Sequence, residues 1–325
     1  TSRVISMKNM FRDCLQITSY DFSNFDTSSV QNMDGMFYNC NLNTIDLSHF
    51  DTSNVISMKE MFRNGKFNSL NLLNFNTIKV QDISYMFDTC TELISIDVSN
   101  FDTTNVKNME YMFNNCSALI SLNASNFNTK KVTKMVNMFR NCKKLISVDL
   151  SSFITTSVTA MTSMFEYCES LSILNISNFR APYVNNVKSM FGSCKELKVL
   201  DISSFITSAV TDMSYLFSDC IKLTEIISLS NFNTQKVSKI NHLFYNCQSL
   251  TSLDLSSFTT ASVQNMNYMF FNCTSIKSLN LSHFSTKNLQ RMSNMFSGCE
   301  SLISLDLSNF DTSSVTKMDS LFERS

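Results

Sequence analysis

The chain has 325 residues and a formal net charge of −1, and 16% of its residues are charged. Because positive and negative charges nearly balance, no basic field favours nucleic acid as a partner. No apolar run approaches the length of a membrane span, so this segment is not expected to insert into a membrane. The composition stands out instead for 28 Phe, 20 Met and 11 Cys.

Those abundant residues fall at fixed positions of an internal repeat of about 26 residues. The Phe of a Met-Phe or Leu-Phe pair marks the repeat at Phe11, Phe37, Phe62, Phe87, Phe113, Phe139, Phe165, Phe191, Phe217, Phe244, Phe270, Phe296 and Phe322. An uninterrupted repeat of this length is typical of a solenoid, in which each unit packs only on its neighbours. We therefore predict one repeat array over residues 1–325, with about 12 full units and a partial one. We also expect it to be a fragment of a longer chain, without capping units.

Each repeat has two halves with different periodicity, as the segment Leu145–Cys168 illustrates. Apolar and polar residues alternate in its first half, LISVDLSSF, which is the pattern of a half-buried strand. In its second half, apolar residues follow Val158 at offsets of three, six, seven and ten, which is a helical stripe. Thr155 precedes this stripe as a candidate N-cap. The sequence thus predicts an α/β repeat solenoid with one short strand and one short helix per unit, and a parallel sheet along one face.

The sulfur-containing residues also form columns in the stacked repeats. Cysteine occupies one column in nearly every unit, at Cys14, Cys40, Cys90, Cys116, Cys142, Cys168, Cys194, Cys220, Cys247, Cys273 and Cys299. Side chains in register point the same way, which disfavours the disulfide dihedral near 90°. We predict buried free thiols, with disulfides or a metal as lesser alternatives, and we interpret the two methionine columns as core packing.

A polar column at the centre of the strands is the main candidate for binding. Acid and amide residues alternate along it, which relieves the repulsion between carboxylates about 4.8 Å apart. On the same face, three apolar residues replace the usual Ser or Thr and are expected to form a contiguous strip. The candidate binding face therefore comprises Asp97, Asn123, Asp149, Asn175, Asp201, Ile173, Val199 and Ile226.

Five Asn-x-Ser/Thr sequons offer candidate glycosylation sites if the protein is secreted by a glycosylating cell. They lie at Asn115, Asn123, Asn175, Asn272 and Asn280. Three of the five fall in the polar strand column.

The sequence gives no indication of catalysis. Its three histidines, His49, His242 and His283, lie in different units and are interpreted as surface or turn residues. No nucleophile–base pair and no phosphate-binding glycine loop is present. We predict a protein that is not an enzyme and has no catalytic residues, no cofactor and no metal site.

The string SLDLSNFDTSSVTKMDSLF, Ser304–Phe322, resembles the repeat of BspA-type leucine-rich-repeat surface proteins. This resemblance covers the whole chain. It implies a right-handed coil, an extracellular or cell-surface location and a role in adhesion, and it supplies no catalytic residues. Phe310 stands where the better-known leucine-rich repeat has Asn, so we expect the Asn and Thr columns beside this Phe to bridge successive turns.

Two functions are compatible with these features. The first is a non-enzymatic extracellular or cell-surface repeat protein that mediates adhesion, or recognises protein or glycan ligands, through its sheet face. The alternative is a structural subunit that stacks end to end with other copies of itself into an extracellular filament.

Overall fold

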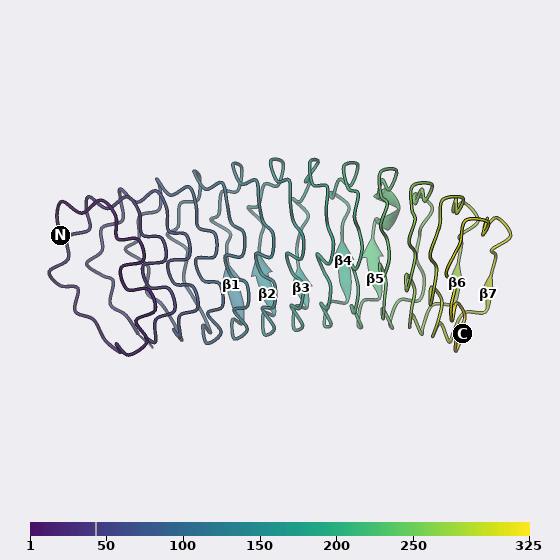
Figure 1. Ribbon diagram of the computed structural model, residues 1–325, viewed down its shortest axis with the longest axis horizontal. Coiled ribbons are helices and arrows are strands. Elements are labelled where there is room, and N and C mark those ends of the chain that lie inside the picture. Colours follow the sequence, from purple (N-terminus) through teal and green to yellow (C-terminus); the bar gives the residue numbers. More distant parts are fainter. Residues whose placement is uncertain (43) are drawn as a thin grey trace. The chain divides into compact units, whose positions relative to one another are not determined.

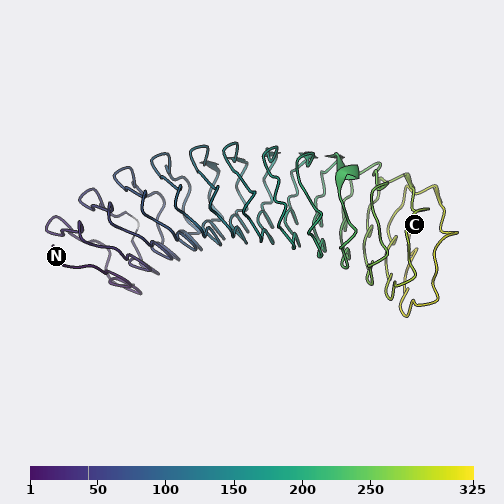
Figure 2. The same ribbon diagram turned by 90° about the horizontal axis from the view of Figure 1, so that it is seen from above.

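The computed structural model describes residues 1–42 and 44–325 and divides into two compact units, Thr1–Ser157 and Val158–Ser325. Within each unit the chain winds into successive turns that lie side by side, one turn for each repeat (Figures 1 and 2). Parallel bridges join each turn to the next, as between Asp82 and Asn108 in the first unit and between Asp212 and Lys239 in the second. The predicted repeat solenoid is therefore confirmed.

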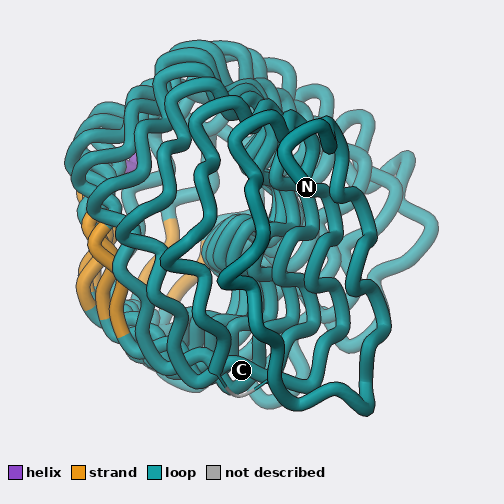
Figure 3. Tube along the Cα trace, turned by 90° about the vertical axis from the view of Figure 1, so that its left-hand side faces the viewer, coloured by secondary structure: helices purple, strands orange, loops and turns teal. Residues whose placement is uncertain are grey.

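The strands are short and parallel, and they lie on one side of the coil (Figure 3). In the first unit β1 (Ser121–Asn123) pairs with β2 (Ser147–Asp149). The second unit contains β3 (Ile173–Leu174), β4 (Val199–Asp201), β5 (Glu225–Ile227), the 3₁₀ helix η1 (Leu229–Asn231), β6 (Ser278–Leu279) and β7 (Ser304–Leu305). There β4 pairs with β5 and β6 pairs with β7, each pair parallel and one repeat apart.

The prediction of one short helix per unit is wrong, because the described residues contain only η1. The segment that should be helical is a run of tight turns bonded to its neighbours. The N–H groups of Met109 and Phe113 donate to the carbonyls of Lys134 and Met138 in the next turn, at 3.1 and 2.9 Å. Between them, the Met112 N–H closes a tight turn onto the Met109 carbonyl at 3.3 Å. About half of the backbone bonds of this segment thus join it to the next turn of the coil, and the others close tight turns inside the segment.

The spacing of the turns explains why no helix forms there. The ring of Phe113 lies 5.3 Å from that of Phe87 and 5.7 Å from that of Phe139, measured between centroids. An α-helix with its side chains is about 10–12 Å wide, so one helix per turn does not fit at this spacing. The chain instead uses left-handed residues, such as Tyr111 and Asn115, both with φ 57°, which aim peptide groups at the neighbouring turns.

Aromatic and sulfur-containing side chains fill the centre of each unit. The Phe columns stack almost in parallel, with interplanar angles of 2° for Phe62 and Phe87 and 4° for Phe191 and Phe217. The methionines beside them are buried, as predicted. They include Met33, Met36, Met58, Met61, Met86, Met109, Met112, Met135, Met138, Met161, Met164, Met190, Met213, Met266, Met269, Met292 and Met295.

The cysteines are free thiols, as predicted, and all but Cys14 are buried. They also bond between turns: the Sγ of Cys116 donates to the Phe87 carbonyl at 3.1 Å, and that of Cys142 to the Phe113 carbonyl at 3.0 Å. Burial raises the pKa of Cys142 to about 12. The thiol is therefore protonated at neutral pH and acts as a donor rather than a nucleophile.

The threonine column is not a set of helix N-caps, because no helix follows it. The buried Oγ1 of Thr129 donates to the Ile154 carbonyl at 3.0 Å and accepts the Ile154 N–H at 2.7 Å, so it bridges two turns. Asn126 bridges to the preceding turn, because its Nδ2 donates to the carbonyls of Val98 and Phe101 at 3.1 and 2.9 Å. The expected bridging by the Asn and Thr columns is confirmed.

The first prediction concerns this threonine bridge. Thr129→Val keeps the shape of the side chain but leaves the Ile154 N–H and carbonyl without their partner, which costs about 2 kcal/mol. We expect a lower urea midpoint by circular dichroism. Thr156→Val is the matched control because Thr156 is exposed, and its midpoint should equal that of the wild type. Equal midpoints for both variants would contradict the bridging role.

Candidate functional site

The polar strand column has a structural role at the end of each strand. The Oδ1 of Asp97 accepts the N–H of Ser99, and that of Asp149 accepts the N–H of Ser151, both at 2.9 Å. Hydrogen bonds from the side chain and the backbone of the serine two residues on lower the pKa of both carboxyls. The same Asx turn forms at Asn123, Asn175 and Asp201. Asp and Asn serve equally in this turn because both side chains supply the accepting Oδ1. All five side chains remain exposed.

The three apolar candidates on this face do not form one strip. Ile173 and Val199 are exposed, but β5 pairs with β4 so that Ile226 stands beside the buried Leu200. Glu225 occupies the position next to Val199 instead. The strip of apolar residues across three turns is therefore interrupted by a carboxylate.

A different apolar strip lies on the sheet side of the first unit. Ile94, Ile120 and Ile146 are 47%, 43% and 47% exposed. They lie in register, because the N–H of Ile120 donates to the Ile94 carbonyl at 3.2 Å and that of Ile146 to the Ile120 carbonyl at 2.8 Å. Sequence reasoning missed this strip. The available signal was the recurring Leu-Ile-Ser string, since two adjacent apolar residues in a strand cannot both face inward.

The five sequons occupy two environments. Asn123, Asn175 and Asn280 are exposed at strand ends. Asn115 and Asn272 belong instead to a ladder of half-buried amides: Asn115 accepts a bond from Asn141, and the Nδ2 of Asn272 donates to Asn246 at 2.6 Å. A glycan on Asn272 would break this ladder.

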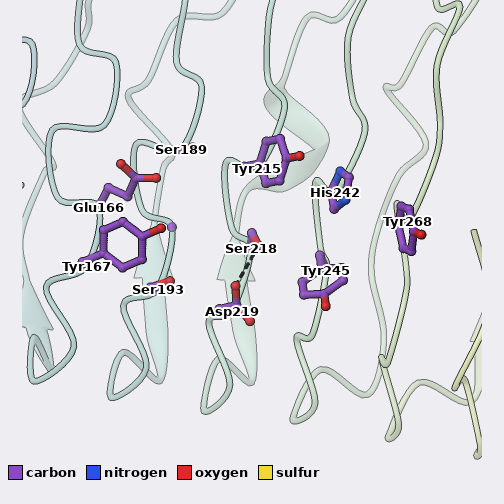
Figure 4. Close-up of a pocket in the computed structure, with 11 residues that line it drawn as sticks. Glu166, Tyr167, Ser189, Ser193, Tyr215, Ser218, Asp219, His242, Tyr245 and Tyr268 are labelled. Carbon is purple, nitrogen blue, oxygen red and sulfur yellow. Dashed lines mark hydrogen bonds between the residues drawn. The ribbon is translucent and has the colours of Figure 1, made fainter. Parts of the chain in front are cut away.

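A hollow of 460 Å³ opens on the side of the second unit that is built from tight turns (Figure 4). Its floor consists of the small residues Ser189, Gly192 and Ser193, all from one turn. The remaining walls come from the turns on either side, and they are Glu166, Tyr167, Tyr215, Ser218, Asp219, His242, Tyr245 and Tyr268. The hollow exists because Ser189, Gly192 and Ser193 are small where an adjacent turn carries Tyr215, Glu166 and Tyr167 in the same columns.

Aromatic rings in register form one wall of this hollow. Tyr215 stacks on His242 at 4.2 Å between ring centroids, and His242 stacks on Tyr268 at 4.7 Å. Burial lowers the pKa of His242 to about 4, although the nearby Asp219 carboxylate acts in the opposite direction. The imidazole is therefore neutral at pH 7 and serves as a flat ring in the stack. The sequence interpretation of His242 as a plain turn residue missed this role.

Asp219 is held in place at the edge of the hollow. Its Oδ1 accepts a bond from the Nδ2 of Asn246 at 2.8 Å, and its Oδ2 accepts one from the hydroxyl of Ser218 at 3.1 Å. Two further acceptor positions of the carboxylate are left for a ligand, since each oxygen has two lone pairs. Asp219 is thus an oriented acceptor beside an aromatic wall.

Residues 1–42 and 44–325 contain no group of three or more His, Cys, Asp or Glu side chains that could hold a metal ion. This part of the chain also has no helix with the length and apolar composition needed to span a bilayer.

The sequence matches the family described as "Mycoplasma protein of unknown function, DUF285" over residues 5–121, 92–205, 119–228, 168–278 and 222–325. The chain therefore belongs to this family. A search of the curated proteins finds no match.

The solved structures that resemble the chain include bacterial leucine-rich repeat proteins. One from Bacteroides ovatus is 16% identical, with a TM-score of 0.48 over 97% of this chain and 87% of that chain. One from Eubacterium ventriosum is 17% identical, with a TM-score of 0.44 over 83% and 80%. A leucine-rich cell surface protein from Faecalibacterium prausnitzii is 15% identical, with a TM-score of 0.30 over 89% and 82%.

The second prediction concerns His242 and pH. Its folded-state pKa of about 4 lies below the usual value of 6.5, so the unfolded chain takes up the proton first as the pH falls. The stability due to the neutral ring is complete above pH 6.5 and is lost as the pH falls toward 4. We expect His242→Asn to remove this slope from the urea midpoint, because Asn294 occupies the equivalent position with a similar φ of 57°.

The control for this measurement is His49→Asn, which removes an exposed imidazole from the first unit. The slope assigned to His242 should persist in this variant. A wild-type slope that persists in the His242→Asn variant would contradict the assignment.

Proposed function

We propose that the chain is a non-enzymatic recognition module of an extracellular or cell-surface protein of the BspA type, and that it binds a protein partner through the sheet side of its first unit. The observation that carries the proposal is the isoleucine strip Ile94–Ile120–Ile146, exposed and held in register by backbone bonds. Aligned apolar side chains exposed to water mark interaction surfaces more often than single ones do.

The chemistry of the strip favours a protein over a glycan. Branched aliphatic side chains offer a dry surface to other aliphatic or aromatic side chains, but they offer neither a ring face nor hydrogen bonds to sugar hydroxyls. Asp97 and Asp149 are exposed and follow Ile94 and Ile146 by three residues in their turns. A partner with an apolar centre and a basic rim complements this arrangement, since interfaces combine an apolar core with a polar edge.

The other residues of the predicted binding face have places in this proposal. Asn123 belongs to the rim of the strip in the first unit. Asn175, Asp201, Ile173 and Val199 form a separate exposed surface in the second unit, where Glu225 adds a carboxylate. That surface is more polar and is the place to examine if the isoleucine strip proves inert.

The third prediction tests the strip with a triple variant, Ile94→Ser, Ile120→Ser and Ile146→Ser. Each half-exposed Ile releases about 1 kcal/mol when it is covered by a partner, so the variant should bind at least tenfold more weakly. The measurement is surface plasmon resonance of the purified chain against a panel of immobilised extracellular-matrix and plasma proteins.

The matched control is the double variant Ile78→Ser and Ile154→Ser, which removes isoleucines of similar exposure, 48% and 42%, away from the strands. Its binding should equal that of the wild type. Binding that survives the strip variant, or binding to a glycan array but to no protein, would contradict the proposal. Electron microscopy of the same preparation tests the alternative, because end-to-end filaments would favour a structural subunit.

The fourth prediction concerns glycosylation in a eukaryotic secretory host. Exposed Asn123, Asn175 and Asn280 should be modified, because their side chains are accessible at strand ends. In the folded, secreted protein Asn272 should be less occupied than these three, because a glycan on its amide would break the bond to Asn246 and hinder folding of the chains that carry it. Site-resolved peptide mass spectrometry measures the occupancy, and a high occupancy at Asn272 would contradict the importance of the amide ladder.

A further inference from the structure

The aromatic stack of the second unit ends at Tyr215 with a ring face on which no further ring of the described residues stacks. One face of Tyr215 is covered by His242. In the preceding turn, Ser189 occupies the column in place of a ring (Figure 4), and the ammonium group of Lys188 lies 5.7 Å from the centre of the Tyr215 ring. Tyr245 is arranged in the same way, because Phe271 stacks on one side of it at 4.9 Å and Ser218 occupies the preceding position. The rings of Tyr215 and Tyr245, in successive turns, thus both line the hollow.

The hollow is long enough along the coil for one further ring. Glu166 and Tyr167 close it on one side and Tyr215 on the other, and one turn of small residues separates them. Neighbouring turns place stacked rings about 4–5 Å apart, as for Tyr215 and His242 at 4.2 Å. A ligand ring beside Ser189 would therefore continue the stack at the position where the protein supplies no ring of its own.

The charges around the hollow restrict the ligand. Glu166 and Asp219 supply two carboxylates against the single ammonium group of Lys188 near the Tyr215 ring, so an anion is disfavoured. An organic cation is disfavoured as well. The ammonium group of Lys188 already lies 5.7 Å from the centre of the Tyr215 ring and would repel a second positive charge there. The remaining class is a neutral ring with hydroxyl groups at its rim.

We propose that this hollow binds a neutral pyranose, such as the terminal sugar of a glycan, whose C–H face stacks on Tyr215 while its hydroxyls donate to Asp219. A pyranose has both features, an apolar ring face and a rim of donors, and sites for small ligands combine an apolar wall with a few convergent polar groups. This site lies on the turn side of the second unit. It is independent of the protein-binding strip proposed for the first unit.

The test uses methyl pyranosides of glucose, galactose, mannose and N-acetylglucosamine as probes, measured by saturation-transfer NMR with the whole chain. We expect saturation of the C–H protons of at least one of them at millimolar concentration. Tyr215→Asn should abolish the signal. The substitution is compatible with the backbone, because Asn137 and Asn294 adopt a similar positive φ at the equivalent position.

A second variant acts without touching the stack. A Cβ at Gly192 would meet its nearest atoms at 3.4 Å, an ordinary contact, so Gly192→Leu fills the floor without displacing backbone. It should also abolish the signal. In the first unit Tyr85 stacks on Tyr111 at 4.5 Å, so Tyr111→Asn is the matched control and should leave the signal unchanged.

The proposal would be overturned by the absence of saturation for every pyranoside, by a signal that survives both Tyr215→Asn and Gly192→Leu, or by stronger binding of tetramethylammonium than of any sugar. A signal lost equally in the Tyr111→Asn control would also overturn it, because the effect would then belong to the fold rather than to the hollow. Circular dichroism of each variant verifies that the solenoid is intact.

Discussion

The rest of the structure depends on the backbone hydrogen bonds between successive turns. They run along both sides of the coil: through the paired strands on one side, and through alternate N–H groups of the tight turns on the other. Their length fixes the distance between equivalent residues at roughly the spacing of neighbouring strands. Side chains in one column must then stack on each other, and this accounts for the parallel Phe rings, the buried thiols and the bridging Thr and Asn side chains.

The sequence predicts the repeat, the strands and the inward columns, but not the backbone of the second half of each unit. The offsets of Val158, Met161, Met164 and Phe165 indicate which side chains face inward, and a ladder of tight turns satisfies the same offsets as a helix. The decisive quantity is the distance between turns, which composition does not reveal. A local signal existed in the columns at Tyr111 and Asn115, where left-handed residues recur and Asn is common.

The candidate sites were predicted less well. The strip depends on the register of the strands, and the hollow depends on positions where the side chains are small. One additional residue in the turn that holds Ile226 moves that side chain next to Leu200 and brings Glu225 beside Val199. A shift of one position in a strand exchanges its two faces, so an apolar strip read from aligned letters is sensitive to a single insertion. The hollow near Gly192 is harder still to predict, since it is defined by side chains that are small.

A rigid ladder also determines how such a protein can acquire ligands. Each turn is held by bonds to both neighbours, so exchanging the residue in one column changes the surface while the backbone stays in place. Ser189 stands in a column that carries Tyr215 and His242 in the following turns. The space that a ring would fill at Ser189 is the proposed site, and the residues that line it are already held in place. Such a site binds without the cost of ordering its own groups, which favours even a small ligand. The surface of such a coil therefore changes through single exchanges within columns rather than through inserted loops.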